Sequence, residues 1–482
     1  MTWNGNIGLH GAELPSAEAR EYMTGSDRAA DPLAGRRTAL AAGRALCVIA
    51  LLFASGDVWP VFKVGFTFRL AQFCVFAAVI LLLSARDRPI RVFPGIGGFY
   101  AFCAWIAVTL PFSLFLERSV AYVVWAMSDA LIVFVFVQYF RSEREVLSLI
   151  RWSMGAYIAI SLFGLVQFGL YAHGINLFVT EWWIKGRVAR INGLSYEPSY
   201  FATYLIAGWV ASCYLIERGA VVPGRRLQWM CLGASTAALL LSSSRMGYVM
   251  MLLWVMFRGA LRLLRAFIRG LFGRSGLRFA LAIGACALTL VGAALRYRAR
   301  LMAIAVALPF LFSGLGVLGH SSHSAGVRIQ GLQRTWRAFL HRPVLGTGIG
   351  ALPVAIAAQR GRGVYDLREA KRFEGMSTAA EVIAETGIVG AALVTAIVVS
   401  VMRAYRVARV HSKPWRRLLL SAQAWGLGWM LLMLQMNQNF LRIYIFVDLA
   451  ILVCTIMLDT PTSLCAHLTH EAGLAADARV AS

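Results

Sequence analysis

Long apolar runs separated by short polar connections form the dominant pattern of the chain. The runs are about 17–20 residues long, which suits α-helices that cross a bilayer. Basic residues gather in alternate connections, and such clusters mark the cytoplasmic side. The pattern predicts an all-α polytopic membrane protein with about twelve transmembrane helices and both ends in the cytoplasm. The expected spans are 45–60, 66–84, 95–112, 119–139, 150–172, 198–216, 228–243, 246–261, 301–318, 378–400, 417–437 and 441–458.

Two polar tails flank the apolar part of the sequence. Residues 1–44 lack a short apolar core with a cleavage site and end in a basic cluster, so we expect a cytoplasmic N-terminal tail rather than a signal peptide. The transmembrane domain is expected over 45–460, and 461–482 should form a cytoplasmic C-terminal tail.

One stretch allows two topologies. If the apolar runs 279–295 and 301–318 both cross the membrane, the polar segment 320–375 lies inside. If the cluster RYRAR at 296–300 stays inside, the first run is re-entrant or surface-bound, and the segment lies outside. We favour the second topology because three clustered arginines resist translocation.

The segment 320–375 is therefore expected to be a large amphipathic loop on the outer side, before the tenth span. It holds eight Arg and one Lys against three acidic residues. An excess of positive charge outside runs against the positive-inside rule. An anionic substrate on the outer face is the simplest reason for keeping it there.

Part of this loop, from Gly326 to Gly350, predicts an amphipathic helix that ends before Pro343. The polar face carries Gln330, Arg334, Arg337 and His341, and the apolar face carries Ile329, Leu332, Trp336, Phe339 and Leu340. Arg328 points towards the apolar side, where a guanidinium needs a partner such as a phosphate. The simpler interpretation is an interfacial helix whose arginines contact lipid headgroups.

Composition narrows the class of protein further. The 482 residues are 59% hydrophobic and only 15% charged, so the net charge of +24 reflects membrane topology rather than nucleic-acid binding. The eight cysteines lie in or beside apolar runs, and no two have metal-ligand or CxxC spacing. We therefore expect buried cysteines, no metal site, no cofactor and no nucleic-acid partner.

Four motifs, in this order, give the chain a family likeness. They are RINGLSYEPSYFATYL (190–205), SSSRMG (242–247), GVR with Trp336 and RPVLGTGIG (326–350), and AEVIAETGIVG (380–390). In motif order, motif spacing, span count and long outer loop, the sequence resembles the O-antigen ligase and O-antigen (exopolysaccharide) polymerase family of polytopic membrane glycosyltransferases. The likeness implies an undecaprenyl-diphosphate-linked glycan donor, the bacterial inner membrane and a catalytic loop on the periplasmic side.

One position departs from the family pattern. The family often has His-Asn shortly before the last Glu-x-Gly, and that His is its proposed base for the acceptor hydroxyl. The corresponding residues here are Met376 and Ser377. The base is therefore open between the carboxylates of Glu197 and Glu381 and an outer histidine. The outer histidines near the motif are His320, His323 and His341.

The likeness also implies roles for arginines and tyrosines of the motifs. Arg328 and Arg245 are the first candidates for gripping the donor's diphosphate, because each lies at the outer end of an apolar element. Further candidate substrate contacts are Arg190, Tyr196, Tyr200, Arg334, Arg337 and His323. Each has a structural alternative: Arg245 could anchor its helix at the interface, and Glu197 and Glu381 could stabilise helix N-termini.

The sequence thus favours a polymerase that joins undecaprenyl-diphosphate-linked repeat units, with inversion and without a metal. A ligase that moves finished glycan to lipid A core is the alternative, and a flippase or transporter of polyprenyl-linked sugars is the alternative of another class. We see no convincing internal repeat of the kind that many transporters show. Besides the donor, the acceptor and the bilayer, the candidate partners are a flippase and a chain-length regulator.

Overall fold

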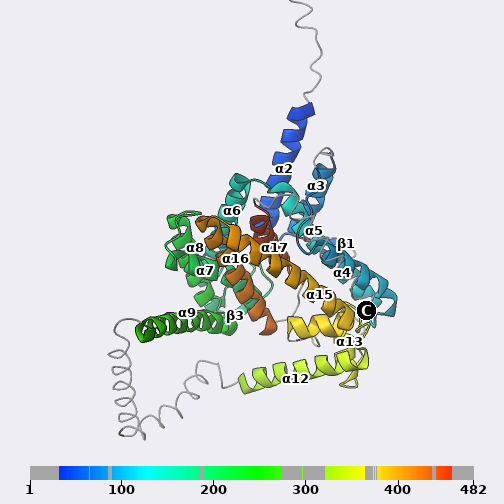
Figure 1. Cartoon of the computed structure of the whole chain (residues 1–482). Coiled ribbons are helices and arrows are strands. Elements are labelled where there is room, and N and C mark those ends of the chain that lie inside the picture. Colours follow the sequence, from blue (N-terminus) through cyan, green and yellow to red (C-terminus); the bar gives the residue numbers. More distant parts are fainter. Residues whose placement is uncertain are drawn as a thin grey trace, which may run out of the picture.

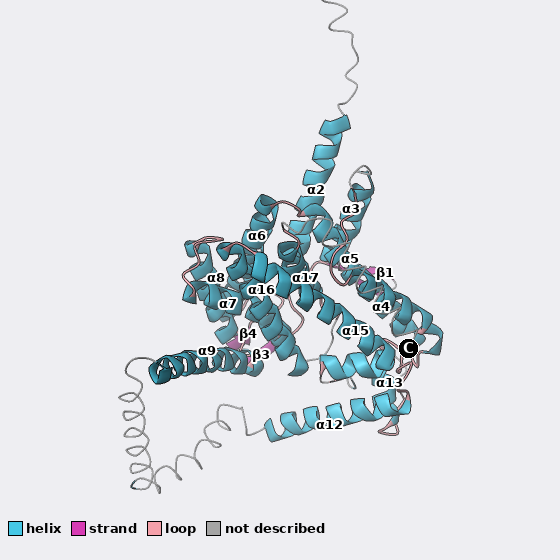
Figure 2. Cartoon of the chain, in the orientation of Figure 1, coloured by secondary structure: helices cyan, strands magenta, loops and turns pink. Residues whose placement is uncertain are grey.

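The computed structural model describes residues 32–64, 66–84, 89–184, 188–272, 296, 321–363, 373, 375, 377–436 and 441–458. Helices dominate these residues, and the strands form two short antiparallel hairpins (Figure 2). The helices that precede residue 320 are α2 (Pro32–Leu52), α3 (Leu70–Ser84), α4 (Ile96–Val108), η1 (Leu110–Phe112), α5 (Leu116–Tyr139), α6 (Glu143–Ala172), α7 (Pro198–Glu217), α8 (Arg225–Leu241) and α9 (Arg245–Phe272). The remaining elements are α12 (Ser321–His341), α13 (Leu352–Ala358), α15 (Thr378–His411), α16 (Pro414–Met433), η3 (Leu434–Met436), α17 (Ile443–Ile456), β1 (Val61–Val64), β2 (Phe66–Arg69), β3 (Glu181–Ile184) and β4 (Val188–Arg190).

The expected all-α architecture is confirmed, whereas the count of twelve membrane spans stays a prediction. Four described helices, α5, α6, α7 and α15, have the length and apolar composition needed to cross a membrane. A helix overlaps every expected span except 301–318, which lies outside the described residues, as does the run 279–295. Helix α2 begins at Pro32, inside the expected N-terminal tail. Residues 459–482 also lie outside the described part of the chain.

Small residues let the central helices pack closely. Gly426 of α16 lies against the Ala207 carbonyl of α7, where an added Cβ would come within 2.6 Å of the oxygen. Gly208, the next residue of α7, faces the ring of Tyr157 on α6. Membrane helices associate through such contacts, because lipid tails remove the hydrophobic advantage of burying larger apolar side chains.

The bundle has two ends with different chemistry. At one end, Arg416 donates from Nε to the Thr455 carbonyl (3.0 Å) and from Nη2 to the Ile456 carbonyl (2.9 Å), which satisfies the last turn of α17. Arg258 pairs with Glu217 at 2.7 Å where α7 ends. We call the end that holds Arg416 and Arg258 the opposite end. The loop end is the other end of these helices, where Asp57, Ser243, Gly346 and Arg442 lie.

Helix α15 is broken near the loop end. Gly387 has φ 67° and ψ −172°, which separates a short N-terminal half of the helix from a long C-terminal half. Figure 1 shows this helix running from the region of α13 and α12 into the centre of the bundle. A break frees backbone groups, and at membrane depth such groups must find partners within the protein.

Candidate functional site

The glycine-rich loop after α12 supplies those partners. Thr347 N–H donates to the Ala384 carbonyl at 2.9 Å, and Gly348 N–H donates to the Glu385 carbonyl at 3.0 Å. Beyond the break, Ile388 N–H donates to the Pro343 carbonyl at 2.8 Å. The loop and the broken helix are therefore complementary halves of one structure, which we call the clasp (residues 343–350 and 384–388).

Glycine is required on both sides of the clasp. Gly346, Gly348, Gly350 and Gly387 all have φ between 67° and 96°, a region that L side chains rarely adopt. A Cβ on Gly387 would collide with the Val344 carbonyl. Gly346 and Gly387 therefore lie where the backbones of the two motifs RPVLGTGIG and AEVIAETGIVG touch.

Two buried glutamates lie beside the clasp. Glu381, in the first turn of α15, and Glu385, one turn later, are both almost inaccessible to solvent. Leu352 N–H donates to Glu385 Oε1 at 3.4 Å. Arg118, near the start of α5, is also buried and donates to the Tyr122 hydroxyl at 2.7 Å. Tyr122 in turn faces Gly350 of the clasp, so this arginine belongs to the same cluster.

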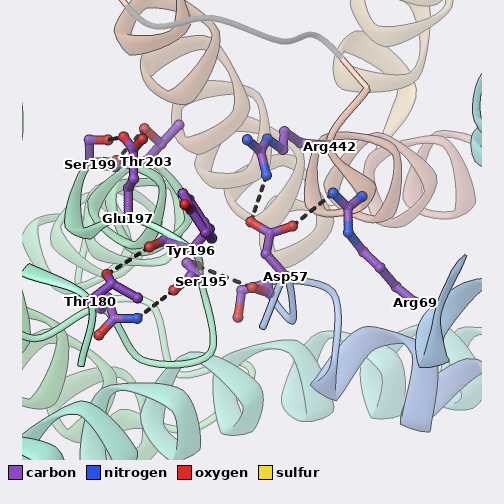
Figure 3. Close-up of polar contacts among 11 residues, drawn as sticks. Asp57, Arg69, Thr180, Ser195, Tyr196, Glu197, Ser199, Thr203 and Arg442 are labelled. Atoms are coloured by element: carbon purple, nitrogen blue, oxygen red, sulfur yellow. Dashed lines mark hydrogen bonds and ion pairs between the residues drawn. The ribbon is translucent and has the colours of Figure 1, made fainter. Parts of the chain in front are cut away.

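The first motif forms a second group at the loop end. Glu197 is the N-cap residue of α7, before Pro198, and its Oε2 accepts from the Ser199 hydroxyl at 3.0 Å (Figure 3). Tyr196 is 49% exposed. Tyr200 is 4% exposed and lies under the guanidinium of Arg442, 3.8 Å from the ring centroid. One face of Tyr200 is thus occupied by an arginine.

Arg442 is part of a buried ion-pair network that the sequence did not reveal. Its Nη1 lies 2.6 Å from Asp57 Oδ2, and Arg69 Nη2 lies 2.9 Å from Asp57 Oδ1 (Figure 3). Asp57 N–H also donates to the Leu194 carbonyl of the first motif. The network therefore ties the start of α17 and the end of β2 to the loop that carries Glu197.

The second motif touches the first one directly. Arg190 pairs with Glu181 across the β3–β4 hairpin, and its Nη2 donates to the Ser243 carbonyl at 3.2 Å. Ser243 adopts a left-handed turn with φ 50°, and α9 begins two residues later at Arg245. Arg245 is exposed at a helix N-terminus, where the helix dipole disfavours a cation and favours an anion. An anion in front of this turn would meet both the guanidinium and the first backbone N–H groups.

The third group lies on α12, which is confirmed as a helix that ends at His341. Arg334 is half-buried and bonds to Gln330 at 3.2 Å, whereas Arg337 is exposed. Arg328 lies in the helix, but its side chain and that of His323 are outside the described residues, as is Met376. The roles of Arg328 and His323 therefore stay predictions from the sequence.

These contacts sort the predicted residues into three groups at the loop end. Arg190, Tyr196, Glu197 and Tyr200 belong to the first motif, which also holds the turn before Arg245. Glu381 lies beside the clasp, and Arg334 and Arg337 belong to α12. Sequence reasoning missed Arg118 and the partners of Arg442, and it gave Glu385 no role in the site. The available signal was position, because ionisable residues at the ends of apolar runs need partners.

Part of the chain that carries these groups matches a known protein family. The family model described as O-antigen ligase matches residues 230–395. This part of the chain belongs to the O-antigen ligase family. The matched region contains the turn before Arg245, α12, the clasp and both buried glutamates, and the first motif contacts it through Arg190 and Ser243. No curated protein matches the chain.

The O-antigen ligase region also fixes the broad class of protein. This family comprises glycosyltransferase-like ligases and polymerases, and the described helices include four that can cross a membrane. The chain is accordingly a membrane protein of glycan ligase or polymerase type. Among the described residues, no group of three or more His, Cys, Asp or Glu side chains could hold a metal ion.

Proposed function

We propose that this protein is an inner-membrane polymerase that joins undecaprenyl-diphosphate-linked oligosaccharide repeat units at its periplasmic face. The observation that carries the proposal is the match to the O-antigen ligase family over the turn, α12 and the clasp. The loop end supports it, because Arg245 of α9 and Arg337 of α12 face solvent there without an acidic partner in the part of the chain that the structure describes. The proposal places the protein in the inner membrane, with residues 320–375 as a catalytic loop on the periplasmic side. It takes a polyprenyl-diphosphate-linked glycan as the donor.

Arg245 and Arg328 have the role of diphosphate ligands. A polyprenyl diphosphate is a weakly basic leaving group, so it needs neutralisation of charge more than protonation. A planar guanidinium can hold two phosphate oxygens at once and remains charged at any physiological pH. Charge that develops on the bridging oxygen as the sugar departs is then stabilised by fixed cations.

The acceptor hydroxyl attacks the anomeric carbon from the face opposite the diphosphate, which inverts the configuration. Glu381 is the carboxylate we assign to receive the hydroxyl proton, with Glu197 as the alternative. Glu381 lies within the matched family region, in the first turn of α15. Glu197 lies outside that region and is engaged by Ser199. A general base must reach the proton it removes, so the two assignments predict different acceptor positions.

A ligase that transfers glycan to lipid A core is the second candidate, because the matching family carries that activity in its name. The two reactions share the donor and differ in the acceptor. A polymerase product stays on the acid-labile polyprenyl diphosphate, whereas a ligase product is attached to lipid A core. The lipid that carries the ladder of chains therefore distinguishes the two products.

Chain formation from lipid-linked repeat units tests the proposal. Arg245→Ala and Arg328→Ala should each reduce polymer by roughly a hundredfold or more, since removing one donor to a developing oxyanion has an effect of that size. Arg225→Ala is the matched control, because Arg225 is also an exposed first residue of a helix but lies at the opposite end. Near-normal ladders from both test variants would refute the arginine role, and a product found only on lipid A core would favour the ligase.

A further inference from the structure

A pocket of about 360 Å³ lies where the C-terminal end of α12 meets α13 and the clasp. Its apolar lining comes from Leu114, Ala338, Ala355 and Ala358, and its polar lining from His341, Arg342, Thr347 and Gln359. Apolar walls with a few converging polar groups are typical of sites for small organic ligands. None of these residues is among those proposed to hold the diphosphate.

The pocket lies in a stretch that carries only positive charge. From Gln330 to Gly363 the sequence has five arginines and one histidine but no aspartate or glutamate. Burial and the positive charges of Arg360 and Arg337 lower the pKa of Arg334. An anion bound here would relieve the repulsion among these side chains.

A hydrogen bond orients the guanidinium of Arg342 at the pocket. Its Nη1 donates to the Phe112 carbonyl at 3.0 Å, which fixes the guanidinium at the pocket wall. Gln359 Nε2 donates to the Arg334 carbonyl at 3.0 Å, so the far wall is also tied to α12. A carboxylate would find its donors pre-positioned, which reduces the entropy that binding costs.

The pocket points away from the apolar stripe of α12. Leu332, Trp336 and Leu340 form this stripe, and Trp336 is 51% exposed. With 3.6 residues per turn, His341 lies about 140° and Ala338 about 160° around the helix from Trp336. If the stripe rests on the bilayer, the pocket opens away from lipid headgroups. A soluble part of the substrate is then the ligand that can reach it.

Distance separates the pocket from the donor's diphosphate. His341 follows Arg328 by 13 positions on α12, which corresponds to roughly 20 Å along the helix axis at 1.5 Å per residue. A diphosphate held by Arg328 cannot also contact His341. An oligosaccharide that extends along α12 from the reaction centre can reach the pocket with one of its distal sugars.

We propose that this pocket binds an acidic sugar of the glycan, and hence that the repeat unit is an acidic oligosaccharide. The sugar's carboxylate lies against Arg342 and His341, and its ring lies against the alanines. Thr347 and Gln359 form hydrogen bonds with the hydroxyls of the sugar ring. The inference rests on the proposed function, since it names the substrate class of that enzyme.

The test uses the full-length protein in phosphatidylcholine nanodiscs and two probes that differ in one group, cellobiuronic acid and cellobiose. Titration followed by saturation-transfer NMR should show the acidic disaccharide binding about tenfold tighter, as expected for one charge-assisted hydrogen-bonded contact. The double variant H341Q/R342Q should remove that difference, whereas Arg225→Gln should keep it. Ala358→Trp, which fills the pocket from α13, should abolish binding of both probes.

Equal affinity for the two disaccharides in the unmodified protein would overturn the inference. So would competition by soluble glycerophosphate as effective as that of cellobiuronic acid, which would identify a headgroup site instead. The titrations contain no polyprenyl diphosphate, so they are independent of catalysis. Absence of polymer from lipid-linked units would refute the proposed polymerase and leave the binding result standing.

Discussion

The two ends of the bundle use arginine in different ways. At the opposite end, Arg416 binds the last carbonyls of α17, and Arg258 binds Glu217. At the loop end, backbone groups of the clasp satisfy the broken helix, and Arg245 and Arg337 remain exposed. Positive charge alone therefore does not mark a functional site. Arg245 and Arg337 differ from Arg416 and Arg258 because the described residues supply a partner only for the latter two.

The largest expected effect comes from breaking the clasp. Gly387→Ala places a Cβ against the Val344 carbonyl and demands a left-handed backbone from alanine, so we expect little folded protein. Gly233→Ala is the control, because a Cβ added to this residue of α8 would meet no described atom within 4 Å. Yield of monodisperse protein in detergent is the measurement. Equal yields of the two variants would show that the break in α15 tolerates a side chain.

The next effect comes from the ion-pair network of the loop end. Asp57→Asn leaves Arg69 and Arg442 as buried cations without their shared carboxylate, and breaking such a pair costs about 3–5 kcal/mol. Because Arg442 of this network also lies over the ring of Tyr200, three residues after Glu197, activity should fall together with thermal stability. A variant that keeps its unfolding temperature would show that the network contributes nothing to folding.

A smaller effect is expected from an arginine of the opposite end. Arg416→Gln removes two charge-assisted bonds to the carbonyls of α17, and we expect a loss of about 2–3 kcal/mol of stability. Donor binding should not change, since Arg416 lies at the other end of the bundle from Arg245. Thermal unfolding and lipid-donor titration measured on one preparation separate the two quantities. A weakened donor affinity in this variant would contradict the division between the ends.

The smallest effect should come from the exposed face of α12. Arg337 is exposed and makes no hydrogen bond or ion pair with the residues that the structure describes. Arg337→Gln should therefore leave the free energy of unfolding unchanged within about 0.5 kcal/mol. The variant should still bind the substrate a fewfold more weakly, since Arg337 adds to the positive potential of the loop. Raising the salt concentration should reduce this difference. A difference that persists at high salt would instead indicate a direct contact.

Periodicity in the sequence predicted the helices well. The start of α7 at Pro198 and the end of α12 before Pro343 follow from the restrictions that proline places on the backbone. The break at Gly387 could not be predicted in the same way, because AEVIAETGIVG contains no proline and continues the helical pattern on both sides of it. Its stability comes from a loop about forty residues earlier, which no local pattern encodes.

The candidate site was predicted only in part for a similar reason. Motifs gave Arg190 and Arg245 at the right end, because both follow short polar signals between apolar runs. The pairing of Arg442 with Asp57 joins residues 385 positions apart, and single-sequence patterns contain no information on such pairs. Arg118 stands at the edge of an expected span in the sequence, although it lies in the cluster beside the clasp in the structure.

Direct titration of undecaprenyl diphosphate into the full-length protein in nanodiscs tests the central claim. The arginine account predicts that Arg245→Gln weakens this binding by about tenfold or more, the loss expected for one charge-assisted contact to phosphate. Arg225→Gln, at the opposite end, should bind as the unmodified protein does. Equal affinities for the unmodified protein and both variants would contradict the claim that the loop end holds the lipid diphosphate through Arg245.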